Sequence, residues 1–95
     1  MEPSNNKKYL LICSDIRPDE FGEGFNCSFT ACYGRLEVEE PWPIPEDYIE
    51  FSRKGIRVRI NELKKRRSKV EICVTGSKPK EFTVNTKDLE ERTED

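Results

Sequence analysis

A strict alternation of apolar and polar side chains over residues 25–33 is the clearest pattern in this chain. A period of two is the spacing of a half-buried strand, in which successive side chains point to opposite faces. Shorter stretches of alternation lie over residues 36–39, 56–60 and 70–74. A continuous apolar run over residues 9–13 is typical of a strand that is covered on both sides. The pattern therefore predicts a protein built mainly from strands.

The segment from residue 45 to residue 54 predicts a short helix. Pro45 suits the first helical turn, acidic residues follow it, and basic residues precede Gly55, which is suited to end the helix. A strand over residues 48–51 is the alternative for the same segment. Phe82 and Val84 indicate one more short strand after a turn.

Proline and glycine mark the expected connections. Residues 16–24 combine one proline and two glycines with acidic side chains and predict a loop. The alternate prolines of residues 41–45 require an extended path. We interpret this path as a stiff crossover that lays Trp42 and Ile44 on the core; a polyproline ligand for an aromatic groove is the alternative.

The order of these elements predicts a mainly β, β-rich α+β fold. We expect a small five- to six-stranded barrel or curved antiparallel sheet, in the order of the oligonucleotide/oligosaccharide-binding fold, with one short helix between strands three and four. A β-grasp-like arrangement is the alternative. One domain is expected over residues 8–89, with a flexible leader at residues 1–7 and a frayed acidic tail at residues 90–95.

Composition and charge add two features to this fold. Only 34% of the 95 residues are hydrophobic and 38% are charged, so the core must be thin and a partner could help to stabilise it. The net charge of −2 hides a strong segregation. Residues 9–50 contain ten acidic and two basic side chains, whereas residues 51–69 contain nine basic and one acidic. Segregation of this kind creates local potentials that favour charged partners.

The residues argue against enzymatic chemistry. The chain has no histidine, which is the usual general base near neutral pH, and no glycine-rich phosphate loop. Acidic pairs such as Glu39 with Glu40 lack convergent spacing and are interpreted as solvated surface. We therefore expect a non-enzymatic protein without a cofactor.

The four cysteines are interpreted as reduced thiols of a cytoplasmic protein. The chain shows no export signal and no apolar stretch long enough to span a membrane, so no membrane partner is expected. Cys27 and Cys32 are the closest pair, and a spacing of five sends them to opposite faces of a strand. This spacing disfavours zinc, although a disulfide or a reactive thiol stays open as an alternative. Cys13 and Cys27 are expected to be buried, and Cys32 and Cys73 to be more exposed.

The strongest candidate site is the basic segment at residues 53–69. Arg53 and Lys54 are explained as the end of the expected helix, and a strand position opposite Glu71 would explain Arg57 or Arg59. The loop expected over residues 61–69 has no such internal explanation. The predicted partner-binding residues are Lys64, Lys65, Arg66, Arg67 and Lys69, with Arg57 and Arg59 extending the track.

Two functions fit this segment. The alternative without a binding role is a solvated loop whose positive charge balances the acidic half of the chain. The first function is a non-enzymatic adaptor or inhibitor that contacts a protein partner with an acidic surface, using the basic hairpin loop and an opposing acidic surface. The second is a single-stranded nucleic-acid-binding domain that uses the same loop for phosphates. Exposed aromatic side chains beside the loop would favour nucleic acid.

Overall fold

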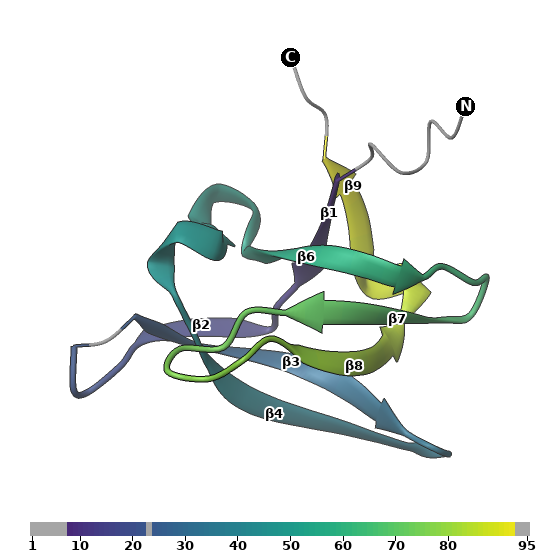
Figure 1. Ribbon diagram of the computed structural model, residues 1–95, viewed down its shortest axis with the longest axis horizontal. Coiled ribbons are helices and arrows are strands. Elements are labelled where there is room, and N and C mark those ends of the chain that lie inside the picture. Colours follow the sequence, from purple (N-terminus) through teal and green to yellow (C-terminus); the bar gives the residue numbers. More distant parts are fainter. Residues whose placement is uncertain (1–7, 23, 93–95) are drawn as a thin grey trace.

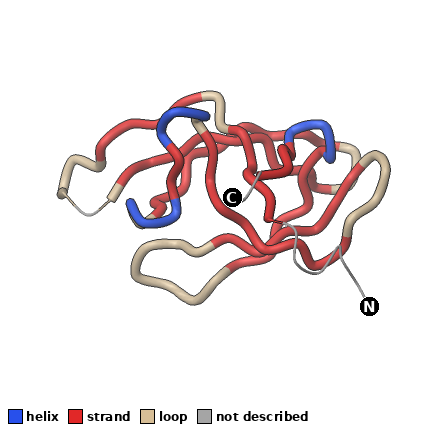
Figure 2. Tube along the Cα trace, turned by 90° about the horizontal axis from the view of Figure 1, so that it is seen from above, coloured by secondary structure: helices blue, strands red, loops and turns tan. Residues whose placement is uncertain are grey.

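The structure, a computed structural model, describes residues 8–22 and 24–92 and is mainly β (Figure 1). Figure 2 shows that strands dominate the chain and that the helical segments are single turns. The elements in chain order are β1 (Lys8–Ile12), β2 (Asp15–Pro18), β3 (Phe25–Tyr33), β4 (Leu36–Ile44), η2 (Glu46–Tyr48), β5 (Ile49–Glu50), η3 (Phe51–Arg53), β6 (Gly55–Glu62), β7 (Arg67–Ile72), β8 (Lys80–Asn85), η4 (Thr86–Asp88) and β9 (Leu89–Arg92).

These strands form two antiparallel sheets. The larger has the order β8-β7-β6-β1-β9, with β5 paired to β6, and the smaller has the order β2-β3-β4. The consecutive strands β8 and β9 lie at opposite edges of the larger sheet, yet only η4 joins them. A flat five-stranded sheet is about 19 Å wide, whereas the link from Asn85 to Leu89 reaches at most about 14 Å. The sheet must therefore curl strongly, which confirms the predicted curved antiparallel sheet; no closed barrel forms among the described residues.

The expected helix at residues 45–54 is replaced by two 3₁₀ turns that flank β5. Ile49 is buried and pairs with Ile56 of β6, so burial of this side chain favours a strand there over a continuous helix. The alternative strand over residues 48–51 is correct only for Ile49–Glu50. Gly55 does not cap a helix, because Lys54 adopts the left-handed conformation at φ 59°. Gly55 instead allows a close approach, since a Cβ there would lie 3.0 Å from Cβ of Leu10.

Two other segments are more regular than the sequence predicts. The expected loop at residues 16–24 begins only after Pro18, because Asp15–Pro18 pair with β3. Residues 41–44 of the expected crossover form the second half of β4, which pairs with β3 along its whole length. β4 is an edge strand of its sheet, and an edge tolerates prolines. Ile44 is nevertheless fully buried, as expected for this segment.

The core lies between the two sheets. Phe82 of β8 meets Phe29 at a ring-centroid distance of 5.3 Å and Trp42 at 5.1 Å, both edge to face. The alternation in β3 correctly predicts the buried positions Cys27 and Phe29, but Tyr33 at its end is 49% exposed. The side chains that are buried in this core cluster are Leu11, Cys13, Cys27, Phe29, Ala31, Ile44, Ile49, Ile56, Val70, Ile72, Phe82 and Val84.

The last described residues also depart from the prediction. Residues 90–92, assigned from sequence to a frayed tail, belong to β9, where Glu90 pairs with Leu10 and Arg92 with Lys8. The pairing with the buried strand β1 orders them. The expected leader at residues 1–7 and the tail at residues 93–95 lie outside the described residues.

Candidate functional site

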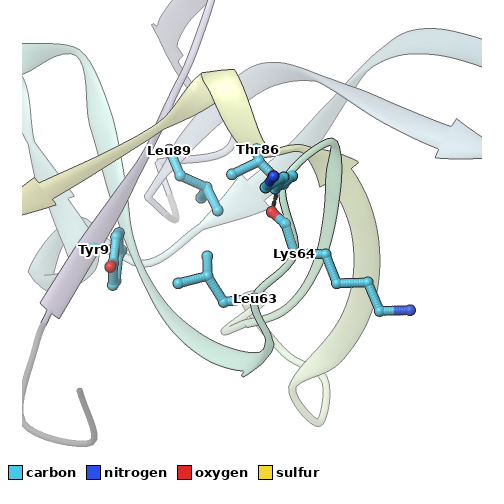
Figure 3. Close-up of a pocket in the computed structure, with 6 residues that line it drawn as sticks. Tyr9, Leu63, Lys64, Thr86 and Leu89 are labelled. Atoms are coloured by element: carbon cyan, nitrogen blue, oxygen red, sulfur yellow. Dashed lines mark hydrogen bonds between the residues drawn. The ribbon is translucent and has the colours of Figure 1, made fainter.

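An apolar hollow of about 570 Å³ lies beside the turn between β6 and β7 (Figure 3). Tyr9 comes from β1, Leu63 from the turn and Leu89 from the start of β9. Figure 3 shows these three side chains facing one another, while the side chain of Lys64 points away from them. Leu63 is 48% exposed, so the hollow offers apolar surface to a ligand. The lining residues are Tyr9, Leu63, Lys64, Lys65, Thr86 and Leu89.

A second hollow of about 690 Å³ adjoins the first and shares Lys64 with it. Its lining consists of four basic residues, Arg35, Lys64, Arg66 and Arg67. Arg35 belongs to the turn between β3 and β4, and the other three belong to the β6–β7 hairpin. Two hairpins from different sheets therefore build one cationic hollow.

Buried hydroxyl contacts fix the shape of the β6–β7 turn. Ser68, 1% exposed, accepts a hydrogen bond from the backbone N–H of Lys64 at 3.1 Å. The hydroxyls of Ser68 and Thr86 lie 2.7 Å apart, and Thr86 Oγ1 donates to the carbonyl oxygen of Lys64, also at 2.7 Å. The N–H of Thr86 binds the carbonyl oxygen of Arg66 at 2.9 Å. The turn is thus held against η4 in one defined conformation.

Arg67 joins the two hairpins that form the cationic hollow. Its Nη1 donates to the carbonyl oxygen of Gly34, and its Nη2 lies 3.5 Å from a carboxylate oxygen of Glu37. Glu37 also accepts a hydrogen bond from Asn85 at 3.3 Å. These contacts hold the β3–β4 turn, and with it Arg35, beside the basic hairpin.

The structure divides the seven predicted site residues. Lys64, Lys65, Arg66 and Arg67 line the hollows, whereas Arg57, Arg59 and Lys69 line neither. The predicted loop at residues 61–69 is also too long, since Arg67 and Lys69 belong to β7 and the turn covers only residues 63–66. The reason is that β6 continues to Glu62 and pairs there with Lys69.

Most of the seven predicted site residues form ion pairs within the protein. Arg57 lies 3.3 Å from Glu50, and Arg59 lies 3.9 Å from Glu71, the cross-strand partner expected from sequence. Glu62 lies 3.1 Å from Lys64 and 3.9 Å from Lys69. The side chains that make no hydrogen bond or ion pair within residues 8–22 and 24–92 include Lys65, Arg66 and Arg35.

Sequence reasoning missed Arg35 and the apolar side of the site. Arg35 belongs to the acidic half of the sequence, although its position after Gly34 in a turn is one that exposes a side chain. Leu63 carried a usable signal, because it is an isolated apolar residue within a basic run. Tyr9 and Leu89 are far apart in sequence, and only the pairing of β1 with β9 brings them together.

The pKa values of two side chains near the site are raised above their ordinary values. Burial raises the pKa of the Asp88 carboxyl; nearby Lys87 lowers this pKa, and the charge of Glu37 raises it. Burial also raises the pKa of the Cys32 thiol, against the opposing charge of Arg67. Cys32 is 5% exposed, which corrects the expectation that it lies near the surface; Asn85 covers it, with its Oδ1 3.8 Å from the sulfur.

Two of the other thiols, those of Cys13 and Cys27, belong to the core cluster. Cys13 and Cys27 are buried as expected; interaction with the neighbouring Cys27 thiol, together with burial, raises the pKa of Cys13. In the described part of the chain, no group of three or more cysteine or acidic side chains is arranged to hold a metal ion. The same part contains no helix that is long and apolar enough to cross a membrane.

Comparisons with known proteins found no match for this chain. No family model matches the chain, and no curated protein or solved structure is significantly similar to it. The function must therefore be argued from the two hollows themselves.

Proposed function

We propose that this protein is a small non-enzymatic binding module, of the adaptor or inhibitor type, that recognises an acidic segment of a protein partner. The observation that carries the proposal is the direct contact of an apolar hollow with a cationic one at Lys64. A peptide segment can place an apolar side chain in the first hollow and acidic groups in the second. Charge complementarity would speed the encounter, and burial of the apolar side chain would add affinity.

The composition of the apolar hollow favours a protein partner over single-stranded nucleic acid. Nucleic-acid binding without sequence preference relies on several aromatic side chains on which successive bases stack. Tyr9 is the one aromatic residue that lines the hollow, and Leu63 and Leu89 supply the rest of its apolar surface. Aliphatic walls suit an aliphatic or aromatic side chain of a peptide better than a row of bases.

The fixed turn supports a binding role. Ser68 and Thr86 hold residues 63–66 through the hydrogen bonds described above, so the turn loses little conformational freedom when a ligand binds. We assign the proposed second, acidic surface to β4 and the β2–β3 region; one end of it adjoins the cationic hollow, because Glu37 of β4 pairs with Arg67. This surface supports the proposed second contact with a partner that itself has charges of both signs.

The test is affinity capture from native lysate, with and without nuclease, using the full chain. Lys65→Ala/Arg66→Ala removes two cations that have no partner among residues 8–22 and 24–92, so folding should be unaffected. The matched control is Arg17→Ala/Lys78→Ala, which removes the same charge from exposed positions outside both hollows. Each captured protein is identified by mass spectrometry and cut to its shortest binding fragment.

We expect the unaltered protein to capture an acidic fragment even after nuclease treatment. The control variant should still bind this fragment, whereas Lys65→Ala/Arg66→Ala should not. Equal capture by both double variants would falsify the proposed site. Loss of all capture after nuclease treatment would instead support the nucleic-acid function.

A further inference from the structure

The cationic hollow has more positive charge than the protein neutralises. Its four lining residues are all basic, and two of them have acidic partners: Lys64 lies 3.1 Å from Glu62, and Arg67 lies 3.5 Å from Glu37. Arg35 and Arg66 have no hydrogen-bonding or ion-pairing partner for their side chains among the described residues. The hollow therefore presents about two uncompensated positive charges to a ligand.

The number and type of these cations favour a dianion with several acceptor oxygens. A carboxylate brings one negative charge and two oxygens, whereas a phosphate monoester brings a charge of about −1.5 to −2 and three acceptor oxygens. Guanidinium groups match phosphate because their planar donors can bind two oxygens at once. Three of the four lining residues are arginines, so the hollow has this donor type in excess.

We infer that the cationic hollow binds a phosphate monoester on a phosphorylated side chain of the protein partner, while an apolar side chain nearby in the same segment enters the apolar hollow. This inference rests on the proposed function and specifies its ligand. Arg35 and Arg66 supply the free guanidinium donors, and Lys64 adds charge at the boundary between the two hollows. Arg67 keeps the two hairpins together and is a positioning residue.

The surroundings of the hollow favour a single phosphate over a nucleic-acid backbone. A strand of nucleic acid carries one charge on each phosphodiester and needs a basic track that follows it. Arg57 and Arg59, which would extend such a track, are paired with Glu50 and Glu71 and do not line the hollow. The two guanidinium groups that are unpaired within the described residues, those of Arg35 and Arg66, line the same hollow, as recognition of a single phosphate monoester requires.

The test uses fluorescence anisotropy with fluorescein-labelled synthetic peptides and the full chain at low salt. Each peptide holds one phosphoserine in an acidic context, with a single leucine placed one to four positions away on either side. Matched peptides carry serine or glutamate in place of phosphoserine, and a single-stranded DNA of equal charge serves as a competitor. The protein variants are Arg35→Ala, Arg66→Ala and their double variant, with Arg17→Ala as the control.

We expect the phosphopeptide with the leucine at its best position to bind about tenfold more tightly than the glutamate peptide. Arg35→Ala and Arg66→Ala should each weaken phosphopeptide binding about tenfold, and the double variant should no longer distinguish phosphoserine from glutamate. In NMR spectra, the side-chain Nε–H signals of Arg35 and Arg66 should shift with the phosphopeptide, whereas that of Arg17 should not. Equal affinity for the phosphoserine and glutamate peptides overturns the inference, as does DNA that competes as strongly as the phosphopeptide.

A separate control distinguishes failure of this inference from failure of the proposed function. The protein captured from lysate is treated with a broad-specificity phosphatase and offered again to the immobilised chain. Loss of binding supports phosphate recognition. Binding that survives phosphatase but is lost in Lys65→Ala/Arg66→Ala overturns the phosphate inference and leaves the acidic-segment function intact.

Discussion

Nη1 of Arg67 donates a hydrogen bond to the carbonyl oxygen of Gly34, a residue 33 positions earlier in the chain. Gly34 adopts a left-handed conformation at φ 63° and forms the β3–β4 turn. The contact therefore docks a turn of the smaller sheet against the first residue of β7 in the larger sheet. One consequence is that Arg35 joins Lys64 and Arg66 around the same hollow.

Replacing Arg67 should lower stability and disturb the site together. Arg67→Ala removes the bond to Gly34 and the ion pair with Glu37, which we expect to cost about 1–2 kcal/mol of the free energy of unfolding. Arg67→Lys keeps the charge but not the two-pronged contact, so its stability should be intermediate. Urea unfolding measures both, and Arg17→Ala is the control because Arg17 is 79% exposed and its ion-pair partner is the nearby Asp15. Equal midpoints for Arg67→Ala and Arg17→Ala contradict the docking role.

Removing the Ser68 hydroxyl should loosen the β6–β7 turn. Ser68→Ala removes the acceptor of the Lys64 N–H in a partly buried hydrogen bond, at a cost of about 1 kcal/mol. The amide of Lys64 should then exchange with deuterium faster than in the unaltered protein, and hydrogen exchange followed by NMR measures this. The exposed Ser52 provides the matched control, Ser52→Ala, for which we expect no change at Lys64. Unchanged exchange in Ser68→Ala would show that other contacts fix the turn.

Phe82 should be among the most costly core residues to replace. It is 7% exposed and packs edge to face on both Phe29 and Trp42, so Phe82→Ala should lower the free energy of unfolding by about 3–5 kcal/mol. Phe82→Leu should cost less because it leaves a smaller cavity. Fluorescence of the single tryptophan during urea unfolding gives the values. Phe21→Ala is the control, since Phe21 is 85% exposed and its loss should change stability by less than about 0.5 kcal/mol.

Thiol labelling should separate one cysteine from the other three. Cys73 is half-buried, whereas Cys13, Cys27 and Cys32 are buried and Cys13 has a raised pKa. A thiol-specific chromogenic reagent should therefore modify one thiol quickly in the folded protein and all four in urea. Cys73→Ser should abolish the fast phase. Rapid labelling of two or more thiols in the native protein would contradict the buried positions.

Asp88 should titrate above its ordinary range, and its protonation should favour the folded state. Because its pKa is raised on folding, the folded protein takes up this proton at a higher pH than the unfolded chain does. The contribution of Asp88 to stability therefore rises as the pH falls through the raised pKa, and it is lost as the pH rises again. Carbon-detected NMR of the side-chain carboxyl measures the midpoint. Glu37→Gln should lower this midpoint only slightly, since burial is the larger cause; an ordinary value in the unaltered protein would contradict the prediction.

The sequence by itself determined the longer alternating strands and most of the core. Alternation located β3, β6 and β7 because a half-buried strand imposes a period of two on its side chains wherever it sits. It also identified Lys64, Lys65 and Arg66 as residues of a basic turn. The expected hairpin placed Arg57 or Arg59 opposite Glu71, and in the structure the partner is Arg59. These features depend on neighbours in sequence or on one adjacent strand.

Tertiary structure alone decided where the helix was lost and what the basic turn faces. Ile49 pairs with Ile56 and is buried. The free energy gained by this burial outweighs the local preference for a helix, which is small even with favourable capping residues. The curl of the larger sheet brings Leu89 beside Leu63, and the contact of Arg67 with Gly34 brings Arg35 to the hollow. Contacts between residues so far apart in the chain depend on the packing and curvature of whole sheets. A local pattern of side chains does not predict that packing or curvature.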